Sequence, residues 1–150
     1  MRLLLILSVF AVSAYATVSS DVVASYLDSL GATYDQAENA FLLYVVEGDE
    51  EPWPFFYIEI SDRDEACYMV GFTPGVLPAT GEARIAGLEV LSDLNWNYTF
   101  VKFSADPETG EVSVSYTFST ENGVGFEAFS AMMYVMIATV QENLEVLSDL

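Results

Sequence analysis

The side chains of this sequence with the greatest capacity for chemistry are its carboxylates. Those that could act together on one substrate or ion lie in two short clusters, residues 62–65 and residues 106–111, and one more lies inside a predicted strand. Two carboxylates about 5 Å or about 6.5–9.5 Å apart can cleave a glycosidic bond, and closely spaced oxygen ligands can hold Ca²⁺. The candidates are Glu59, Asp62, Asp64, Glu65, Asp106, Glu108 and Glu111.

Most of these acids lie in predicted turns, where charged side chains are expected because turns face water. Neither cluster fits the loop pattern of EF-hand calcium sites. A carboxylate-based hydrolase and an acidic calcium-binding surface protein are therefore kept as alternatives. The sequence itself predicts no catalytic residue, no metal site and no cofactor.

Two residue types that usually carry catalysis are scarce. The sequence has no histidine and a single cysteine, Cys67. This removes the commonest general base and metal ligand and leaves no second thiol for an intrachain disulfide. Cys67 lies in an apolar run, so we expect a small core residue rather than a nucleophile. These features predict a protein that is not an enzyme.

The composition is strongly acidic and rich in apolar residues. The chain has 150 residues, of which 4 are basic and 23 acidic, giving a formal net charge of −19. Nucleic acid and anionic membrane surfaces are excluded as expected partners, because both are bound through Lys and Arg. We interpret the acidity as a solvated surface, as in a saline habitat, with a cationic partner or Ca²⁺ as the alternative. At 53% hydrophobic residues, the chain has enough for the core of one domain.

The N-terminus has the layout of a secretory signal peptide. Met1-Arg2 is a short basic start, residues 3–12 form an apolar run, and Ala14-Tyr15-Ala16 is a small-residue cleavage site. Residues 3–16 would span about 21 Å as a helix, too short for a hydrocarbon core of about 30 Å. We therefore predict a signal peptide at residues 1–16 and a single domain at residues 17–150. The mature protein would be exported, periplasmic or extracellular, and free of the membrane.

Hydrophobic patterning predicts an α+β fold with the order α-β-β-β-α-β-β-α. Short runs rich in Val and aromatic residues, separated by polar turns, indicate a five-stranded, mainly antiparallel sheet. Apolar residues at helical spacing indicate helices packed on one face of that sheet. The predicted strands cover residues 40–47, 55–60, 66–73, 98–103 and 111–118, and the predicted helices cover residues 21–30, 80–97 and 122–147.

Two local signals set boundaries within this pattern. Asp106 followed by Pro107 suits a type I turn, and Gly110 suits a position with positive φ after it. Asn95 or Asn97 can adopt a left-handed conformation and end the second predicted helix.

Two predicted helices could present surfaces to a partner. In the second helix, Ile85, Leu88, Leu91 and Leu94 recur every three residues and predict an apolar stripe. The last helix is apolar nearly all round, which is typical of helices buried on more than one side. Its methionines could form an adaptable contact surface, with core packing as the alternative. The partner is expected on the more polar face of the sheet or on the second helix, and the last helix is expected to help form a dimer. The helix residues predicted for this partner or dimer surface are Ile85, Leu88, Met132, Met133 and Met136.

Several segments resemble the YbjN-like domains, which share their fold with the type III secretion chaperones. The resemblance lies in Leu94-Asn95-Trp96-Asn97, Phe100-Val101-Lys102-Phe103-Ser104, the turn at residues 106–110, and the opening helix at residues 26–34. It implies a compact α+β domain that often dimerises, binds a protein or peptide, and has no set of catalytic residues. The expected role is therefore that of a chaperone-like or adaptor-like binding protein, with a possible homodimer.

Overall fold

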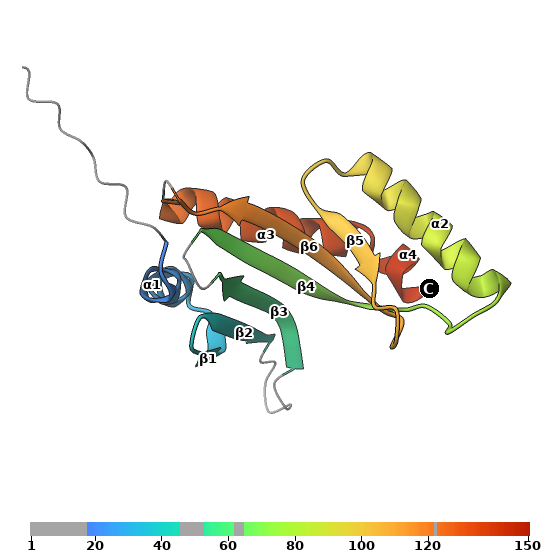
Figure 1. Ribbon diagram of the computed structural model, residues 1–150, viewed down its shortest axis with the longest axis horizontal. Helices are drawn as coiled ribbons and strands as arrows, with labels where there is room; N and C mark the ends of the chain where they lie inside the picture. The colour runs from blue at the N-terminus through green and yellow to red at the C-terminus, as the bar shows by residue number, and fades with distance from the viewer. Residues whose placement is uncertain (1–17, 46–52, 62–64, 122) are drawn as a thin grey trace, which may run out of the picture.

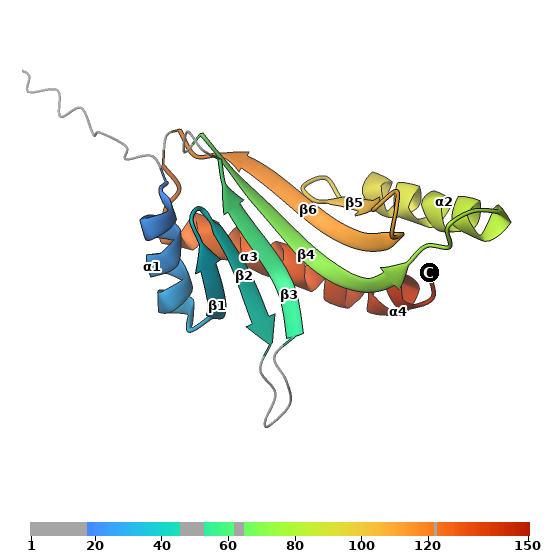
Figure 2. The ribbon, with the colours of Figure 1, turned by 60° about the horizontal axis from the view of Figure 1, so that its bottom comes forward.

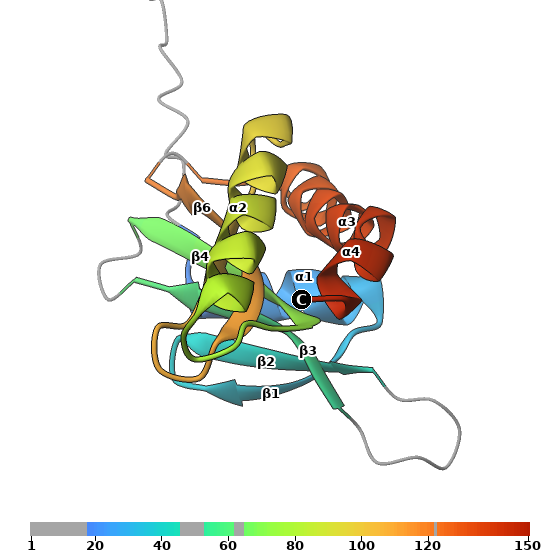
Figure 3. The same cartoon turned by 90° about the vertical axis from the view of Figure 1, so that its right-hand side faces the viewer.

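The computed structural model describes residues 18–45, 53–61, 65–121 and 123–150 as one antiparallel sheet with its helices on one side (Figures 1 and 3). The six strands follow the spatial order β1-β2-β3-β4-β6-β5. They are β1 (Thr33–Ala37), β2 (Ala40–Val45), β3 (Trp53–Ile60), β4 (Ala66–Val76), β5 (Lys102–Ala105) and β6 (Glu111–Ser119). The helices are α1 (Ser20–Leu30), α2 (Glu82–Asn97), α3 (Phe126–Glu142) and α4 (Leu144–Ser148).

The predicted fold class is confirmed, with six strands in place of the expected five. The additional strand is β1, which forms the edge of the sheet and pairs with β2 in the register Ala37↔Ala40. Its residues are mostly polar and exposed, so hydrophobic patterning gives no signal for it. Glu38, with φ of 52°, begins the two-residue turn between the strands, the length typical of tight hairpins.

Alternation along the strands separates a buried face from a solvent face. Phe56, Ile58 and Ile60 are buried on the helical side, as their spacing predicts, and Val112 and Val114 continue that face on β6. In Figure 2 the strands lie in front of α3, so the view is onto the face that none of the described helices covers. On that face β6 carries Ser113, Ser115 and Thr117, while β4 carries the exposed Tyr68 and Phe72.

The long predicted strands and helices differ at their ends from what the sequence indicates. β4 continues past Pro74 to Val76, because the irregularity between Phe72 and Val76 in its pairing with β6 places the proline in a bulge. The single helix expected at residues 122–147 is two helices, α3 and α4, that meet at Asn143. Within the described residues no helix is both long and apolar enough to cross a membrane.

The apolar stripe predicted on α2 is wrong. Leu91 and Leu94 are buried, whereas Ile85 is 59% exposed and Leu88 is 45% exposed. A step of three residues turns an α-helix through about 300°, so each step drifts by about 60°. Ile85 and Leu94 consequently lie on opposite sides of the helix, and the face of α2 that packs on the domain carries Gly87, Leu91 and Leu94.

The N-terminal helix is held to the start of α3 by aromatic contacts. The ring of Tyr26 lies 5.3 Å from that of Phe129 and 5.7 Å from that of Phe126, between centroids. The Tyr26 hydroxyl donates a 2.8 Å hydrogen bond to the carbonyl of Val124. Phe129 is fully buried, and these contacts fix the N-terminal end of α3 over the sheet.

Candidate functional site

A groove of about 310 Å³ opens between α3, β6 and the segment that joins α2 to β5. We call it the apolar groove. Tyr116 projects into it from the helical face of β6, next in alternation to the buried Val114. In Figure 1 α3 runs along β6, while α2 lies beyond β5 at the end of the molecule away from α1. The groove is lined by Phe100, Val101, Tyr116, Ala128, Ala131, Met132 and Val135.

One wall of the apolar groove is a face of α3. Ala128, Ala131 and Val135 follow one another at helical spacing and are all exposed. An adjacent face, about 80–100° around the helix from Ala128, carries the buried Phe129 and Met136. The helix is therefore apolar on two sides, one for the core and one for the groove, which accounts for its nearly uninterrupted apolar sequence. The two alanines leave space where larger side chains would fill the groove.

The second wall is the α2–β5 connection, which Asn95 holds in place. The Asn95 side chain donates a 2.9 Å hydrogen bond from Nδ2 to the Phe103 carbonyl and accepts a 2.7 Å bond at Oδ1 from the Phe103 amide. It thus pairs with the free edge of β5 as a neighbouring strand would. The predicted helix end at Asn97 is confirmed, but the predicted left-handed conformation is wrong, because Asn95 and Asn97 are both helical and neither has a positive φ.

We expect Asn95→Ala to lower the free energy of unfolding by about 1–3 kcal/mol. The change leaves two backbone groups of a partly buried strand without their partners, which is the costly way to remove a hydrogen bond. Urea denaturation followed by circular dichroism measures the loss. The control is Asn97→Ala, at an exposed helical asparagine two residues later, which should cost less than about 0.5 kcal/mol. Equal losses would mean that Asn95 does not secure β5.

The two walls are also tied together at one end. The Tyr98 hydroxyl, on the α2–β5 side, donates a 3.2 Å hydrogen bond to Glu142 Oε2 on α3. It accepts a 2.8 Å bond from Nδ2 of Asn143, which also donates to the carbonyl of Thr139. These bonds link the connection to the junction of α3 and α4 and limit how far the walls can separate.

The structure divides the residues predicted for a partner surface among three places. Met132 lines the apolar groove, while Met133 and Met136 are buried in the core. Ile85 and Leu88 lie on the solvent side of α2 and do not line the groove. Sequence reasoning missed Phe100, which is 70% exposed at the mouth of the groove. The only feature of the sequence that could have identified it is the position of an aromatic residue just before an edge strand.

Two of the acidic residues considered for catalysis or calcium binding accept hydrogen bonds in the structure, and two others lie outside the described residues. Glu59 accepts a 2.8 Å hydrogen bond from the Tyr57 hydroxyl. Hydrogen bonds from the amides of Thr109 and Glu108 hold the pKa of Asp106 below its ordinary value. Asp62 and Asp64 lie outside the described residues. In the described part of the chain, no three His, Cys, Asp or Glu side chains come close enough to hold a metal ion.

Cys67 is a core residue, as its apolar surroundings predict. Its side chain is fully buried on the helical face of β4, and this burial raises the pKa of the thiol to about 12. A thiol at that pKa is almost entirely protonated at neutral pH and is a poor nucleophile.

Comparisons with known proteins place this architecture among solved structures of the same fold. YbjN from E. coli is 19% identical, covers 90% of this chain and 93% of its own, and superposes with a TM-score of 0.64. A chain of the ExsC–ExsE complex is 13% identical with a TM-score of 0.60, covering 85% of this chain and 92% of its own. A chain of the heterodimeric ExoU–SpcU complex from the type III secretion system of Pseudomonas aeruginosa is 13% identical with a TM-score of 0.55, covering 84% of this chain and 98% of its own.

At the level of sequence, no curated protein matches the chain. A protein family does match, and it matches nearly the whole of the predicted domain. Residues 19–148 fit the YbjN family, described as "Putative bacterial sensory transduction regulator". The match starts beside α1 and ends within the last turn of α4, so it includes every described strand and helix. The chain therefore belongs to the YbjN family.

Proposed function

We propose that this protein binds a segment of a partner protein in the apolar groove, as a chaperone or adaptor does, and catalyses no reaction. The observation that carries the proposal is an exposed hollow lined almost entirely by apolar side chains. Exposed apolar surfaces of this kind mark sites of interaction. Two structures with the same fold are complexes of two different proteins, ExsC–ExsE and ExoU–SpcU, which supports a protein as the ligand.

The shape and chemistry of the groove favour a peptide over a small metabolite. Its volume is at the lower end of the roughly 300–1,000 Å³ typical of ligand pockets. Small-molecule sites also need several well-placed polar groups to orient the ligand. Here the hydroxyl of Tyr116 is the only side-chain polar group among the lining residues. An apolar side chain projecting from a peptide needs no such groups, because its backbone can stay in water.

The place of action is a further part of the proposal. Residues 1–16 have the basic start, apolar run and small-residue site of a signal peptide, and they lie outside the described residues. We propose that they direct export and are removed, so that the folded domain meets its partner in the periplasm or outside the cell. The acidic, cysteine-poor composition is compatible with those compartments.

The substitution Ala131→Glu tests the groove. The probe is a fluorescein-labelled amphipathic peptide of about 18 residues, with Leu at helical spacing and Gln at the polar positions. We expect fluorescence anisotropy to show at least about tenfold weaker binding to Ala131→Glu, because the carboxylate would occupy an apolar hollow. Ala86→Glu is the matched control, an exposed helical alanine on α2, and should change the affinity less than about twofold.

Two results would overturn the proposal. One is wild-type protein that binds no such peptide, and the other is equal weakening by the two glutamates. Light scattering on the same samples examines the possible homodimer. If the wild-type protein is a dimer and the Ala131→Glu variant is a monomer, the groove is a contact between two copies of this chain rather than a site for another protein.

A further inference from the structure

We infer that the segment bound in the apolar groove carries Lys or Arg residues on both sides of its apolar anchors. This inference rests on the proposed function and names the chemistry of the ligand. It follows from the positions of the charged side chains around the groove, which are negative at both ends.

Each end of the groove wall on α3 has an exposed glutamate. Glu127 lies one helical turn before the lining residue Ala131, and Glu142 lies two turns after the lining residue Val135. At 3.6 residues per turn, Glu142 falls within the groove face of α3 and Glu127 falls at its edge, about 40° around the helix from Ala131. The bond from Tyr98 to Glu142 places that carboxylate beside the second wall as well. A ligand lying along α3 therefore meets a carboxylate as it enters and as it leaves.

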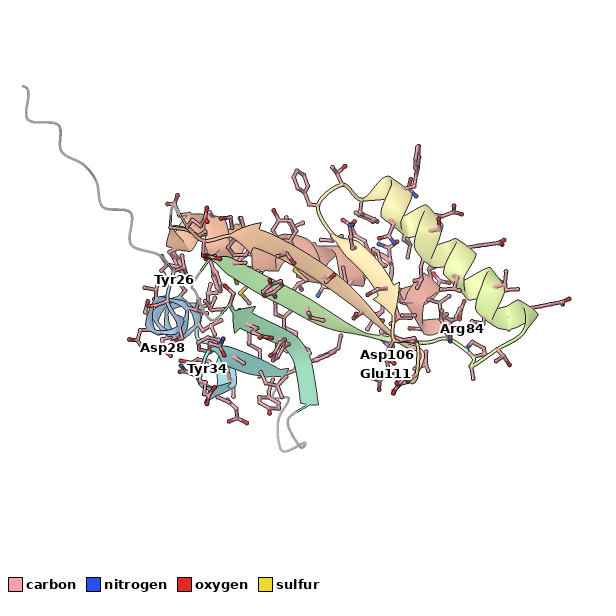
Figure 4. All side chains as sticks on the ribbon, viewed as in Figure 1. Tyr26, Asp28, Tyr34, Arg84, Asp106 and Glu111 are labelled. Atoms are coloured by element: carbon pink, nitrogen blue, oxygen red, sulfur yellow. The ribbon has the colours of Figure 1, made fainter. Side chains whose placement is uncertain are left out.

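The described cationic side chains are directed elsewhere. Lys102 pairs with Ser115 across β5 and β6, on the face of the sheet that no helix covers. Arg84 donates a 2.9 Å hydrogen bond to the Pro78 carbonyl. Figure 4 shows Arg84 near Asp106, at the end of the molecule away from Tyr26. With a formal net charge of −19 for the whole chain, the groove has a negative rim, which attracts a positively charged ligand.

The separation of the two glutamates argues for an elongated peptide instead of a bound cation. Fifteen residues of α-helix separate Glu127 from Glu142, which corresponds to about 22 Å at about 1.5 Å per residue. Ligands of one metal ion lie within about 2.6 Å of it, so the two carboxylates cannot share an ion. A distance of about 22 Å is spanned by about fifteen helical residues or about seven extended ones.

Peptides that differ only in end charge test the inference. Three versions of the amphipathic probe carry Lys, Gln or Glu at both ends, with the same leucines. We expect the Lys peptide to bind about three- to tenfold more tightly than the Gln peptide in low salt, and the Glu peptide to bind more weakly than either. The difference should shrink in about 0.5 M NaCl, because salt screens exposed charges.

Protein variants locate the effect. Glu127→Gln combined with Glu142→Gln should reduce the preference for Lys over Gln to less than about twofold, and glutamine still offers Tyr98 an acceptor. The control pair, Glu82→Gln with Glu89→Gln, removes two exposed charges from α2 and should leave the preference unchanged. Equal reduction by both pairs would overturn the inference, because the preference would then reflect net charge.

The outcomes separate this inference from the proposed function. If the peptides bind with no preference for Lys but still require Ala131, the inference fails and the groove remains a binding site. If no peptide binds to the wild-type protein, the proposed function itself fails. A preference for the Glu peptide would also overturn the inference, since it would require a positive rim.

Discussion

Gly110→Ala is expected to lower the free energy of unfolding by about 3 kcal/mol or more, enough to remove a large part of the stability of a domain this size. Gly110 has φ of +79°, a left-handed conformation that costs a residue with a Cβ about 1–2 kcal/mol. A Cβ there would also collide with the carbonyl oxygen of Leu77. The Leu77 backbone cannot easily move away from this Cβ, because the Leu77 amide donates a 2.8 Å hydrogen bond to the Gly110 carbonyl.

The matched control for this prediction is Gly81→Ala. Gly81 also has a positive φ, +92°, but nothing lies within 4 Å of the position its Cβ would take. With ψ of −172° it lies in a region that residues other than glycine rarely adopt, so it should lose only the conformational part, about 1–3 kcal/mol. Urea denaturation of both variants, compared at equal m-values, isolates the cost of the collision. Equal losses for the two variants would show that the contact with Leu77 relaxes at no cost.

The position of Gly110 also explains why the turn before β6 is built as it is. Oδ1 of Asp106 accepts 2.8 Å hydrogen bonds from the amides of Glu108 and Thr109, and the Asp106 carbonyl accepts a 3.0 Å bond from the amide of Gly110. The turn is thus closed by its own residues. The Gly110 carbonyl points out of the turn and accepts the hydrogen bond from Leu77, the residue that follows β4. This bond ties the turn before β6 to the end of β4.

The parts of the fold that the sequence predicted are those governed by short-range alternation. Phe56, Ile58 and Ile60 share a face because side chains alternate along a strand, and their burial confirms it. The turn ending at Gly110 was predictable because few residues adopt a positive φ. These signals depend on neighbours in the chain, so no knowledge of the tertiary structure is needed to interpret them.

The errors arise where tertiary contacts decide. β1 is a strand because β2 offers an edge to pair with, although Thr33–Ala37 is polar. Asn95 resembles a helix stop, yet its side chain serves β5 eight residues later. Apolar residues spaced by three in α2 do not form one stripe, because each step of three residues falls about 60° short of a full turn. In each case the outcome depends on packing or pairing with another segment, which a local sequence pattern does not record.

The candidate site was predicted only in part for the same reason. An apolar α3 indicates burial on two sides but cannot say which side is the core. Of the three methionines predicted to form a contact surface, Met132 lines the groove, while Met133 and Met136 are buried in the core. The groove exists because Ala128 and Ala131 are small at the level where Phe100 and Tyr116 approach from other segments. That coincidence of small and large side chains is visible only after folding.

The second large effect is expected for Phe129→Ala, which should lower the free energy of unfolding by about 3–5 kcal/mol. The Phe129 ring is fully buried and contacts Tyr26, so its removal leaves a cavity between α1, α3 and the sheet. Chemical denaturation measures the loss. Phe126→Ala is the control, because its ring contacts the same tyrosine but is 38% exposed, and it should cost about 1 kcal/mol.

This prediction also connects the core to the groove. The side chain of Phe129 points about 100° around α3 from that of Ala128, into the core rather than into the groove. Its packing fixes the part of α3 that carries Ala128 and Ala131. We therefore expect Phe129→Ala to weaken binding of the Gln-flanked peptide at temperatures where the variant is still folded, whereas Phe126→Ala should leave binding nearly unchanged. A variant that loses stability and binds normally would show that the groove wall is positioned by the Tyr98 bridge to Glu142 and Asn143 instead.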